Sequence, residues 1–257
     1  MLAQEEIIKG VAKRNGKTLL EIKHLYKSFE NNHVLIDFNM DLQDGENLVI
    51  LGKSGSGKSV LIKCIIGLLK PDQGTIRVFG EDIPGLNQEE LDRVRVKVGF
   101  LFQSNALYDS MTVRQNLEFP LRRHWIRRSH ENVDDLVKNT LEDVGLAHTI
   151  NMMPAELSGG MRKRIALART LILKPKIILY DEPTTGLDPI TGKEIIELMV
   201  RVQQKYETAS IIISHDMNCV KMASDRVIIL LDGKCYADGR FERLKEMTDP
   251  KVRQFFE

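Results

Sequence analysis

One short motif limits the fold of this chain more than any other feature. Residues 52–59 read Gly-Lys-Ser-Gly-Ser-Gly-Lys-Ser, which matches the pattern Gly, four residues, Gly-Lys-Ser. The apolar run at 47–51 predicts a strand before the motif, and the Leu- and Ile-rich segment 60–69 predicts a helix after it. A strand, a glycine-rich loop and a helix in this order form a phosphate cradle, because consecutive backbone N–H groups can point at phosphate oxygens.

This phosphate loop is expected to bind a nucleotide. The residues expected to touch the nucleotide are Gly52, Lys53, Ser54, Gly55, Ser56, Gly57, Lys58, Ser59 and Val60. Lys58 would reach the β- and γ-phosphates, and the Ser59 hydroxyl would ligate Mg²⁺. A Gly- and Ser-rich surface loop is the alternative, and the predicted strand and helix on either side of the motif argue against it.

An apolar strand that ends in two carboxylates is the second sign of a nucleotide site. Residues 177–182 read Ile-Ile-Leu-Tyr-Asp-Glu. Asp181 would lie at the sheet edge beside the phosphate loop, where a carboxylate can hold Mg²⁺ directly or through water. Glu182 would then accept a proton from the attacking water or orient it. An acidic strand end that leads into a turn is the alternative, and the upstream phosphate loop weighs against it.

The composition excludes several classes of protein. Lys and Arg number 37 against 36 Asp and Glu, so the net charge of +1 gives no argument for nucleic acid as a partner. The cysteines, Cys64, Cys219 and Cys235, are odd in number and far apart, which predicts unpaired thiols in a reducing compartment. No window approaches the ~20 apolar residues of a membrane span. Residues 1–10 lack the long apolar core of a secretory signal.

The first third of the chain predicts a separate β-sheet. Residues 1–17 are polar and charged and are interpreted as an N-terminal extension, either a frayed leader or a short docking helix. Segments 18–27 and 34–42 alternate between apolar and polar residues and predict strands of an N-terminal sheet. Further predicted elements are a strand at 75–79, a helix at 88–96 and a strand at 98–102.

We predict one domain over residues 18–257. Beyond the N-terminal sheet, the pattern of this domain favours a parallel sheet with an inserted helical part. Strand-length apolar runs at 176–180, 209–213 and 227–231, with a helical stretch at 191–204, are typical of a parallel sheet covered by helices. Helical patterning dominates from 112 to 174, which predicts an inserted helical subdomain.

Further motifs resemble those of the ATP-binding cassette (ABC) ATPases. Leu157-Ser158-Gly159-Gly160-Met161 is similar to the family signature, which usually reads Leu-Ser-Gly-Gly-Gln, and 162–169 fits the helix that follows it. The other matches stand in family order: Phe29 for the aromatic that stacks on adenine, Gln103 for the Q-loop, Asp188 for the D-loop and His215 for the switch histidine. The resemblance covers roughly residues 18–239, and so many motifs in one order make a chance match negligible.

The resemblance implies an α/β fold, the ABC ATPase fold, in which a RecA-like P-loop core carries an N-terminal antiparallel β-subdomain and a helical subdomain at roughly 104–174. It implies ATP hydrolysis coupled to transport, with ATP and Mg²⁺ as cofactors. The metal ligands that it implies are Ser59, Gln103 and Asp181, and the catalytic residues are Lys58, Glu182 and His215. Phe29, Asp188 and His215 are further implied ATP contacts.

The signature implies a second copy of the chain. Ser158, Gly159 and Gly160 would stand at a helix N-terminus, which is a ready anion site. In ABC proteins this site completes the γ-phosphate pocket of the opposite subunit, so the resemblance implies two copies that close head to tail around two ATP molecules. Met161 replaces the usual Gln, and a thioether cannot make the hydrogen bonds of an amide.

Other segments look like the ATPases of Mla-type, MCE-associated lipid transporters. They are Met161 and residues 100–113, 119–122, 188–191 and 249–255. This resemblance implies membrane permease subunits, an MCE-domain protein and a phospholipid or related cargo. It places the chain at the cytoplasmic face of the inner membrane, held there through the permease.

Alternative functions remain, and the sequence favours some of them over others. Within transporters, an importer of a polar solute is the nearest alternative. A soluble ABC ATPase that acts on nucleic acid is disfavoured, because the chain has one cassette and no heptad insertion between Ser59 and Leu157. A non-catalytic regulatory cassette is disfavoured by the intact catalytic residues. The basic segment 122–128, which contains the only Trp, is interpreted as a solvated helix with an anchoring Trp rather than as a membrane or permease patch.

Overall fold

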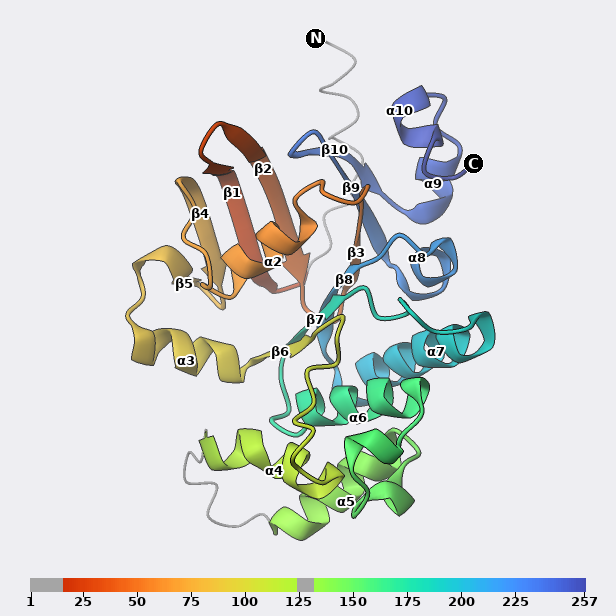
Figure 1. The fold of residues 1–257 in the computed structure, drawn as a ribbon. Helices are drawn as coiled ribbons and strands as arrows, with labels where there is room; N and C mark the ends of the chain where they lie inside the picture. Colours follow the sequence, from red (N-terminus) through yellow and green to blue (C-terminus); the bar gives the residue numbers. More distant parts are fainter. Residues whose placement is uncertain (1–15, 124–131) are drawn as a thin grey trace.

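The computed structural model describes residues 16–123 and 132–257, which form two β-sheets surrounded by helices (Figure 1). The smaller sheet has the strand order β2-β1-β4-β5 and is antiparallel throughout. Its strands are β1 (Thr18–Phe29), β2 (Asn32–Gln43), β4 (Gln73–Val78) and β5 (Glu81–Asp82). The predicted N-terminal antiparallel sheet is therefore confirmed.

The larger sheet has the order β10-β9-β3-β8-β7-β6. Its strands are β3 (Asn47–Leu51), β6 (Val98–Leu101), β7 (Ile177–Asp181), β8 (Ala209–Ile213), β9 (Arg226–Leu231) and β10 (Lys234–Gly239). Every pairing from β9 to β6 is parallel, and only the edge strand β10 is antiparallel to its neighbour. Parallel pairing brings the carboxyl ends of β3, β7 and β8 to one edge, where the predicted site residues follow.

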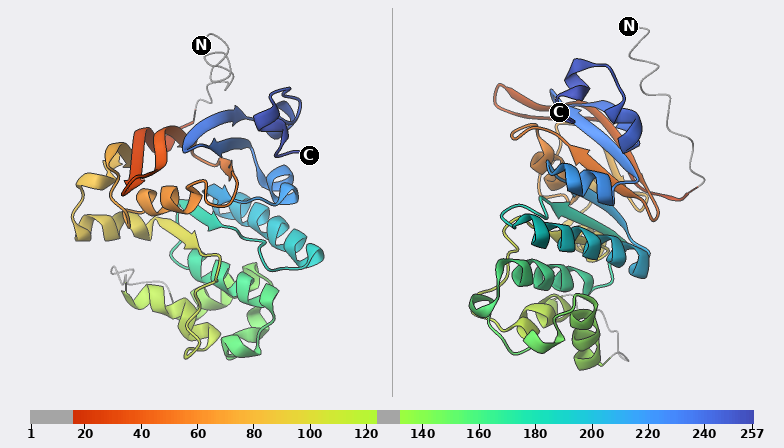
Figure 2. Two further views of the ribbon diagram at one scale, coloured as in Figure 1. Left: turned by 45° about the horizontal axis from the view of Figure 1, so that its top comes forward. Right: turned by 90° about the vertical axis from the view of Figure 1, so that its right-hand side faces the viewer.

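Some helices pack against the two faces of the larger sheet, and others form a separate group beyond it. They are α2 (Lys58–Ile65), α3 (Gln88–Val96), α4 (Val113–Arg123), α5 (Val133–Asp143), α6 (Gly159–Leu171), α7 (Pro189–Tyr206), α8 (Met217–Ala223), α9 (Phe241–Lys245) and α10 (Pro250–Arg253). Within the described residues, short 3-10 helices occupy Ile83–Gly85, Ala147–Thr149 and Pro154–Glu156. In both views of Figure 2, α4 and α5 lie at the end of the molecule opposite the smaller sheet, which matches the expected helical subdomain in position.

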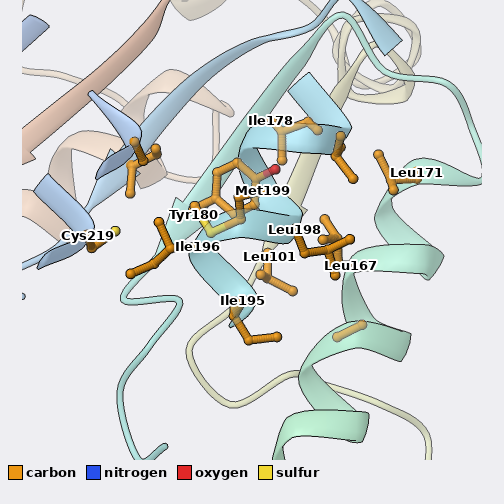
Figure 3. Packing of buried hydrophobic residues seen from close by; sticks show 14 of the residues in the cluster. Leu101, Leu167, Leu171, Ile178, Tyr180, Ile195, Ile196, Leu198, Met199 and Cys219 are labelled. Atoms are coloured by element: carbon orange, nitrogen blue, oxygen red, sulfur yellow. The ribbon is translucent and has the colours of Figure 1, made fainter. Parts of the chain in front are cut away.

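Two apolar clusters lie on the two faces of the larger sheet. Val49 and Leu51 of β3 belong to the cluster that includes side chains of α6, α7 and α8, and Figure 3 shows part of it around Tyr180. Leu48 and Ile50 belong to the cluster that includes α2 and the smaller sheet. This division follows from the alternation of side chains along a strand. All of β3 is buried, as expected for a central parallel strand.

The structure changes some predicted boundaries. The helix predicted at 60–69 begins at Lys58, directly at the end of the phosphate loop, and ends at Ile65. Its last turn closes when the N–H groups of Gly67 and Leu68 bond back to the carbonyls of Cys64 and Lys63. The predicted extension and the basic segment fall largely outside the described residues, at 1–15 and 124–128.

Candidate functional site

The phosphate loop folds around the Lys58 side chain. The Lys58 ammonium donates hydrogen bonds of 2.6 Å to the Gly52 carbonyl and 2.9 Å to the Lys53 carbonyl. Burial lowers the pKa of Lys58, and the carboxylates of Glu182 and Asp181 oppose this shift. The predicted lysine is therefore close enough to both predicted carboxylates for their charges to act on it, although more than a hundred residues separate them in the sequence.

The loop and the helix after it offer donors to an anion. Gly57 has φ 101°, and a Cβ there would lie 2.9 Å from Val34 Cγ1, so a larger residue does not fit. No side chain caps α2 at Gly57, and no acidic residue stands in its first turn, which leaves its first N–H groups to a ligand. The buried Ser56 hydroxyl has no hydrogen-bond partner within the described part of the chain. These features fit a phosphate-binding role.

Asp181 and Glu182 follow β7 at the same edge of the sheet. The Glu182 N–H donates to the Ile213 carbonyl at 2.9 Å, which ties the end of β7 to the end of β8. Burial and then the neighbouring Glu182 raise the pKa of Asp181, and Lys58 is the first of the cations that lower it. Glu182 has φ 49°, an uncommon conformation for a residue other than glycine.

The donors near Asp181 fit a hard cation. The exposed Ser59 hydroxyl and the Asp181 carboxylate are oxygen donors of the kind that Mg²⁺ prefers. Among the described residues there is no group of three or more His, Cys, Asp or Glu side chains that could hold a metal ion. A Mg²⁺ ion bound here would therefore need phosphate and water oxygens as well, as is usual for this cation.

The structure joins Glu182 to His215. His215 Nδ1 lies 2.8 Å from Glu182 Oε2 in a hydrogen bond, and the Thr185 hydroxyl donates to the same oxygen at 3.4 Å. The Glu182 side chain is only 14% exposed, whereas that of His215 is 69% exposed. The imidazole therefore holds the carboxylate on one side and faces solvent on the other.

Gln103 and Phe29 are both exposed near the ends of their strands. Gln103 comes shortly after β6, and its backbone carbonyl accepts a hydrogen bond of 3.0 Å from the Lys163 ammonium. Phe29 ends β1 and is 44% exposed, with Lys27 Nζ 5.4 Å from its ring centroid. An ion pair of 2.7 Å with Asp72 holds Lys27 in place. The Phe29 ring is thus presented to solvent, as a stacking platform requires.

The signature residues stand at the N-terminus of α6. Ser158 caps this helix by accepting a hydrogen bond of 3.2 Å from the Met161 N–H. Asp188 caps α7 in the same way, through the N–H groups of Ile190 and Thr191 at 3.1 and 3.0 Å. The two helix starts adjoin, because a Cβ on Gly160 would lie 2.6 Å from Thr191 Cγ2.

The signature helix and the phosphate-loop helix lie on opposite faces of the larger sheet, since α6 packs into one apolar cluster and α2 into the other (Figure 1). Within one chain, Ser158, Gly159 and Gly160 and the phosphate loop therefore begin helices that lie in different layers of the fold. Met161 packs as a half-buried side chain against the cluster around α6.

Sequence reasoning missed two cations of α6, Lys163 and Arg169. Both donate to carbonyls of the segment 103–106, which is defined here as the Q-loop segment. In the sequence, residues 161–164 read Met-Arg-Lys-Arg, and nothing local distinguishes a buried lysine from its solvated neighbours. Only the helical spacing of Lys163 from the apolar residues after it could have indicated an inward position.

Known proteins are similar to this chain over most of its length. Residues 35–185 match the family model described as ABC transporter. The intermembrane phospholipid transport system ATP-binding protein MlaF of Haemophilus influenzae is 39% identical, over 93% of this chain and 90% of that protein. The probable ribonucleotide transport ATP-binding protein mkl of Mycobacterium leprae is also 39% identical, over 92% of this chain and 68% of that protein.

A solved structure agrees with the fold over most of the chain. The dimeric ATP-binding cassette MJ0796, in a post-hydrolysis state bound to ADP and phosphate, superimposes with a TM-score of 0.77 and 30% identity. The match covers 86% of this chain and 98% of that one. The phosphate loop, the carboxylate strand and the signature helix thus belong to a fold already known to hold a hydrolysed nucleotide.

Proposed function

We propose that this chain, which belongs to the ABC transporter family and is an ATP-hydrolysing subunit coupled to transport, energises the movement of phospholipid or a related lipid. The observation that carries the lipid assignment is the 39% identity to the phospholipid-transport protein MlaF along nearly the full length of both chains. Met161 in the signature and the segment 100–113 support it, because they resemble the Mla-type ATPases.

Lys58 and the loop N–H groups bind the phosphates of ATP in this proposal. Phosphate oxygens carry charge and replace the neutral carbonyls of Gly52 and Lys53 as partners of the Lys58 ammonium. Ser59, Asp181 and Gln103 would hold Mg²⁺, which when bound neutralises charge on the phosphates. Phe29 stacks on the adenine ring.

Glu182 is the proposed base of the hydrolysis step. Its carboxylate is shielded from bulk water and held by His215, so that one oxygen can take a proton from the attacking water. The exposed side of His215 is available to the γ-phosphate. Proton acceptance thus belongs to Glu182 and orientation to His215.

A second copy of the chain completes the site. Ser158, Gly159 and Gly160 begin α6 and the phosphate loop leads into α2, and these helices pack in different apolar clusters. In this proposal the signature therefore serves the nucleotide of a partner copy. The dimeric cassette structure, bound to ADP and phosphate, supports this arrangement. Asp188 stands next to the signature in the same chain and would lie near that shared interface.

The permease contact is proposed for the helical subdomain. A cavity of about 240 Å³ opens there between Ser110, Met111, Gln115, Phe119 and Arg122. Its mixture of apolar walls and one cation suits an amphipathic cytoplasmic segment of a membrane protein. Among the described helices, none is long and apolar enough to cross a membrane. On the similarity to MlaF, we place the chain at the cytoplasmic face of the inner membrane, bound to permease subunits, with an MCE-domain protein in the complex and no nucleic acid.

Reconstitution of the native complex tests the lipid assignment. The complex is purified through this chain, placed in vesicles, and followed for ATP-dependent movement of a fluorescent phospholipid. Movement is expected with the wild-type chain and not with Lys58→Ala, which removes the phosphate-binding cation. A complex that contains a solute-binding protein and moves a polar solute would overturn the lipid assignment and leave the ATPase assignment intact.

A polar cargo is the second candidate. It is favoured by the similarity to the mycobacterial protein named for ribonucleotide transport, which has the same percentage identity to this chain. The chain spans about two thirds of that protein's length but nine tenths of MlaF. The same vesicles, loaded with labelled ribonucleotide, distinguish the two cargoes.

A further inference from the structure

Lys163 is a buried cation to which the proposed mechanism gives no role. It lies in the second turn of α6 with only 1% of its surface exposed. Lysine is almost never fully buried unless its ammonium is paired, because removing an ammonium from water is costly. The neighbours of this ammonium therefore indicate what it does.

The Lys163 ammonium faces two parts of the nucleotide site. Its Nζ donates a hydrogen bond of 3.0 Å to the backbone carbonyl of Gln103. Burial lowers the pKa of Lys163, and the attraction of the Asp181 carboxylate opposes that shift. The same attraction helps to counter the burial of Asp181. One side chain of the signature helix thus holds the Q-loop segment by a hydrogen bond, and its charge acts on the carboxylate at the end of β7.

A second cation of α6 holds the same segment. The Arg169 guanidinium donates to the carbonyls of Ala106 at 2.6 Å and Asn105 at 3.1 Å. Asn105 and Ala106 have φ angles of 64° and 50°, which residues with a side chain rarely adopt. Such a conformation persists only where the surrounding structure holds it. The Q-loop segment therefore depends on α6 for its shape.

We propose that Lys163 is a positioning residue that holds the Q-loop segment in the shape that presents Gln103 to the nucleotide site. Its hydrogen bond fixes the backbone carbonyl of Gln103, and together with Arg169 it ties residues 103–106 to the signature helix. The signature helix thereby sets the shape of the segment that leads into the helical subdomain. The inference rests on the proposed role of Gln103.

Two substitutions separate the charge from the packing. Lys163→Met removes the ammonium and keeps an unbranched apolar chain, and Lys163→Arg keeps the charge. Lys163→Met is expected to lower kcat about tenfold and to change KM for ATP less than about threefold, because nucleotide binding depends on other residues. Lys163→Arg should retain kcat within about threefold. Lys138→Met, at an exposed lysine of α5, is the matched control and should match the wild type.

Hydrogen exchange distinguishes positioning from a structural role. In Lys163→Met, amides of residues 99–108 should exchange faster while those of 164–171 stay as protected as in the wild type. The substitution leaves the Gln103 carbonyl without its protein donor, so the urea midpoint is expected to fall. The local pattern of exchange, rather than the midpoint, tests the proposal. Uniform loss of protection along α6, or wild-type kcat with unchanged exchange at 99–108, would overturn the proposal. Exchange needs no turnover, so it tests the inference even if the separate lipid assay fails.

Discussion

At the scale of single residues, the two main catalytic candidates have different partners. The Lys58 ammonium bonds to neutral carbonyls of its own loop, so a phosphate can replace them at little cost. Glu182 is instead held by two side chains, His215 and Thr185. Substitution of Lys58 should therefore affect binding, whereas substitution of Glu182 should affect only the chemical step.

Glu182→Gln should bind ATP normally and lose turnover by about 10²–10⁴-fold, since an amide cannot accept the proton from water. The isosteric side chain can still hydrogen-bond to His215. Calorimetry with ATP and a phosphate-release assay measure the two quantities. Lys58→Ala is the contrasting variant, with both affinity and turnover reduced. Turnover near the wild-type rate in Glu182→Gln would remove Glu182 from the role of base.

At the scale of elements, the starts of α6 and α7 are packed so closely at Gly160 that a Cβ there would overlap Thr191. Asp188 caps α7, and Thr191 in its first turn faces Gly160 of the signature. This contact sets the position of the signature relative to the start of α7. Gly160 is thus required by packing as well as by its expected contact with a phosphate.

Gly160→Ala should destabilise the chain by about 1–3 kcal/mol, because the new methyl group meets Thr191 Cγ2. Gly160→Ala with Thr191→Ser should recover most of that loss, since serine keeps the hydroxyl and lacks the methyl group. Urea unfolding of both variants, with Thr191→Ser alone as the control, measures the effect. A double variant as unstable as the single one would show that the methyl contact is not the cause.

A single arginine joins the two sheets through ion pairs. Arg226 at the start of β9 forms ion pairs with Asp41 of β2 at 3.3 Å, with Glu46 at 3.2 Å and with Asp238 of β10 at 3.7 Å. Burial raises the pKa of Asp238 to about 6, Arg226 acts against this rise, and Asp41 and Glu46 add to it. Three carboxylates are thus paired with the guanidinium of one buried residue, Arg226.

This cluster predicts a pH dependence of stability. The pKa of Asp238 is higher in the folded state than its ordinary value, so the folded state holds the proton more tightly. Its contribution to stability therefore falls as pH rises from about 4 to about 6. Asp238→Asn should match the wild type near pH 4 and exceed its unfolding free energy at pH 7.5. Urea midpoints at the two pH values test this, and a variant less stable than the wild type at pH 7.5 would contradict it.

At the scale of the whole molecule, the phosphate loop and the signature begin helices that pack in different apolar clusters, so one nucleotide is not expected to contact both motifs of the same copy. In an assembly of two copies, the phosphate loop of each copy would face the signature of the other. An ATP molecule between the two copies would bring its negative phosphates to the N-terminus of α2 in one copy and to the N-terminus of α6 in the other. Association should therefore depend on the nucleotide.

The Glu182→Gln chain should be monomeric alone and dimeric with saturating Mg-ATP, because slow hydrolysis preserves the bound nucleotide. Light scattering after size exclusion measures the mass in each state. Ser158→Arg, which places a bulky cation at the signature, is the control and should stay monomeric with ATP bound. A Glu182→Gln chain that stays monomeric with ATP bound, also when the permease is present, would count against the two-copy site.

Much of the fold could be predicted because its signals are local. The phosphate loop is a consecutive motif, β3 and β8 have the predicted bounds, and the ordered motifs identify the ABC fold. The end of α2 was misplaced because its apolar residues continue to Leu69, past the turn that stops the helix. Local patterns report what a segment prefers, and they do not report where tertiary contacts end it.

The sequence by itself determined the family, the order of the elements and the residue types of the nucleotide site. Only the tertiary structure decided that His215 holds Glu182, that the buried Lys163 bonds to the Gln103 carbonyl, and that one arginine serves three carboxylates. Each of these contacts joins residues from separate elements. Their energies depend on burial and on charges brought near by packing, and neither quantity is contained in any single stretch of the chain.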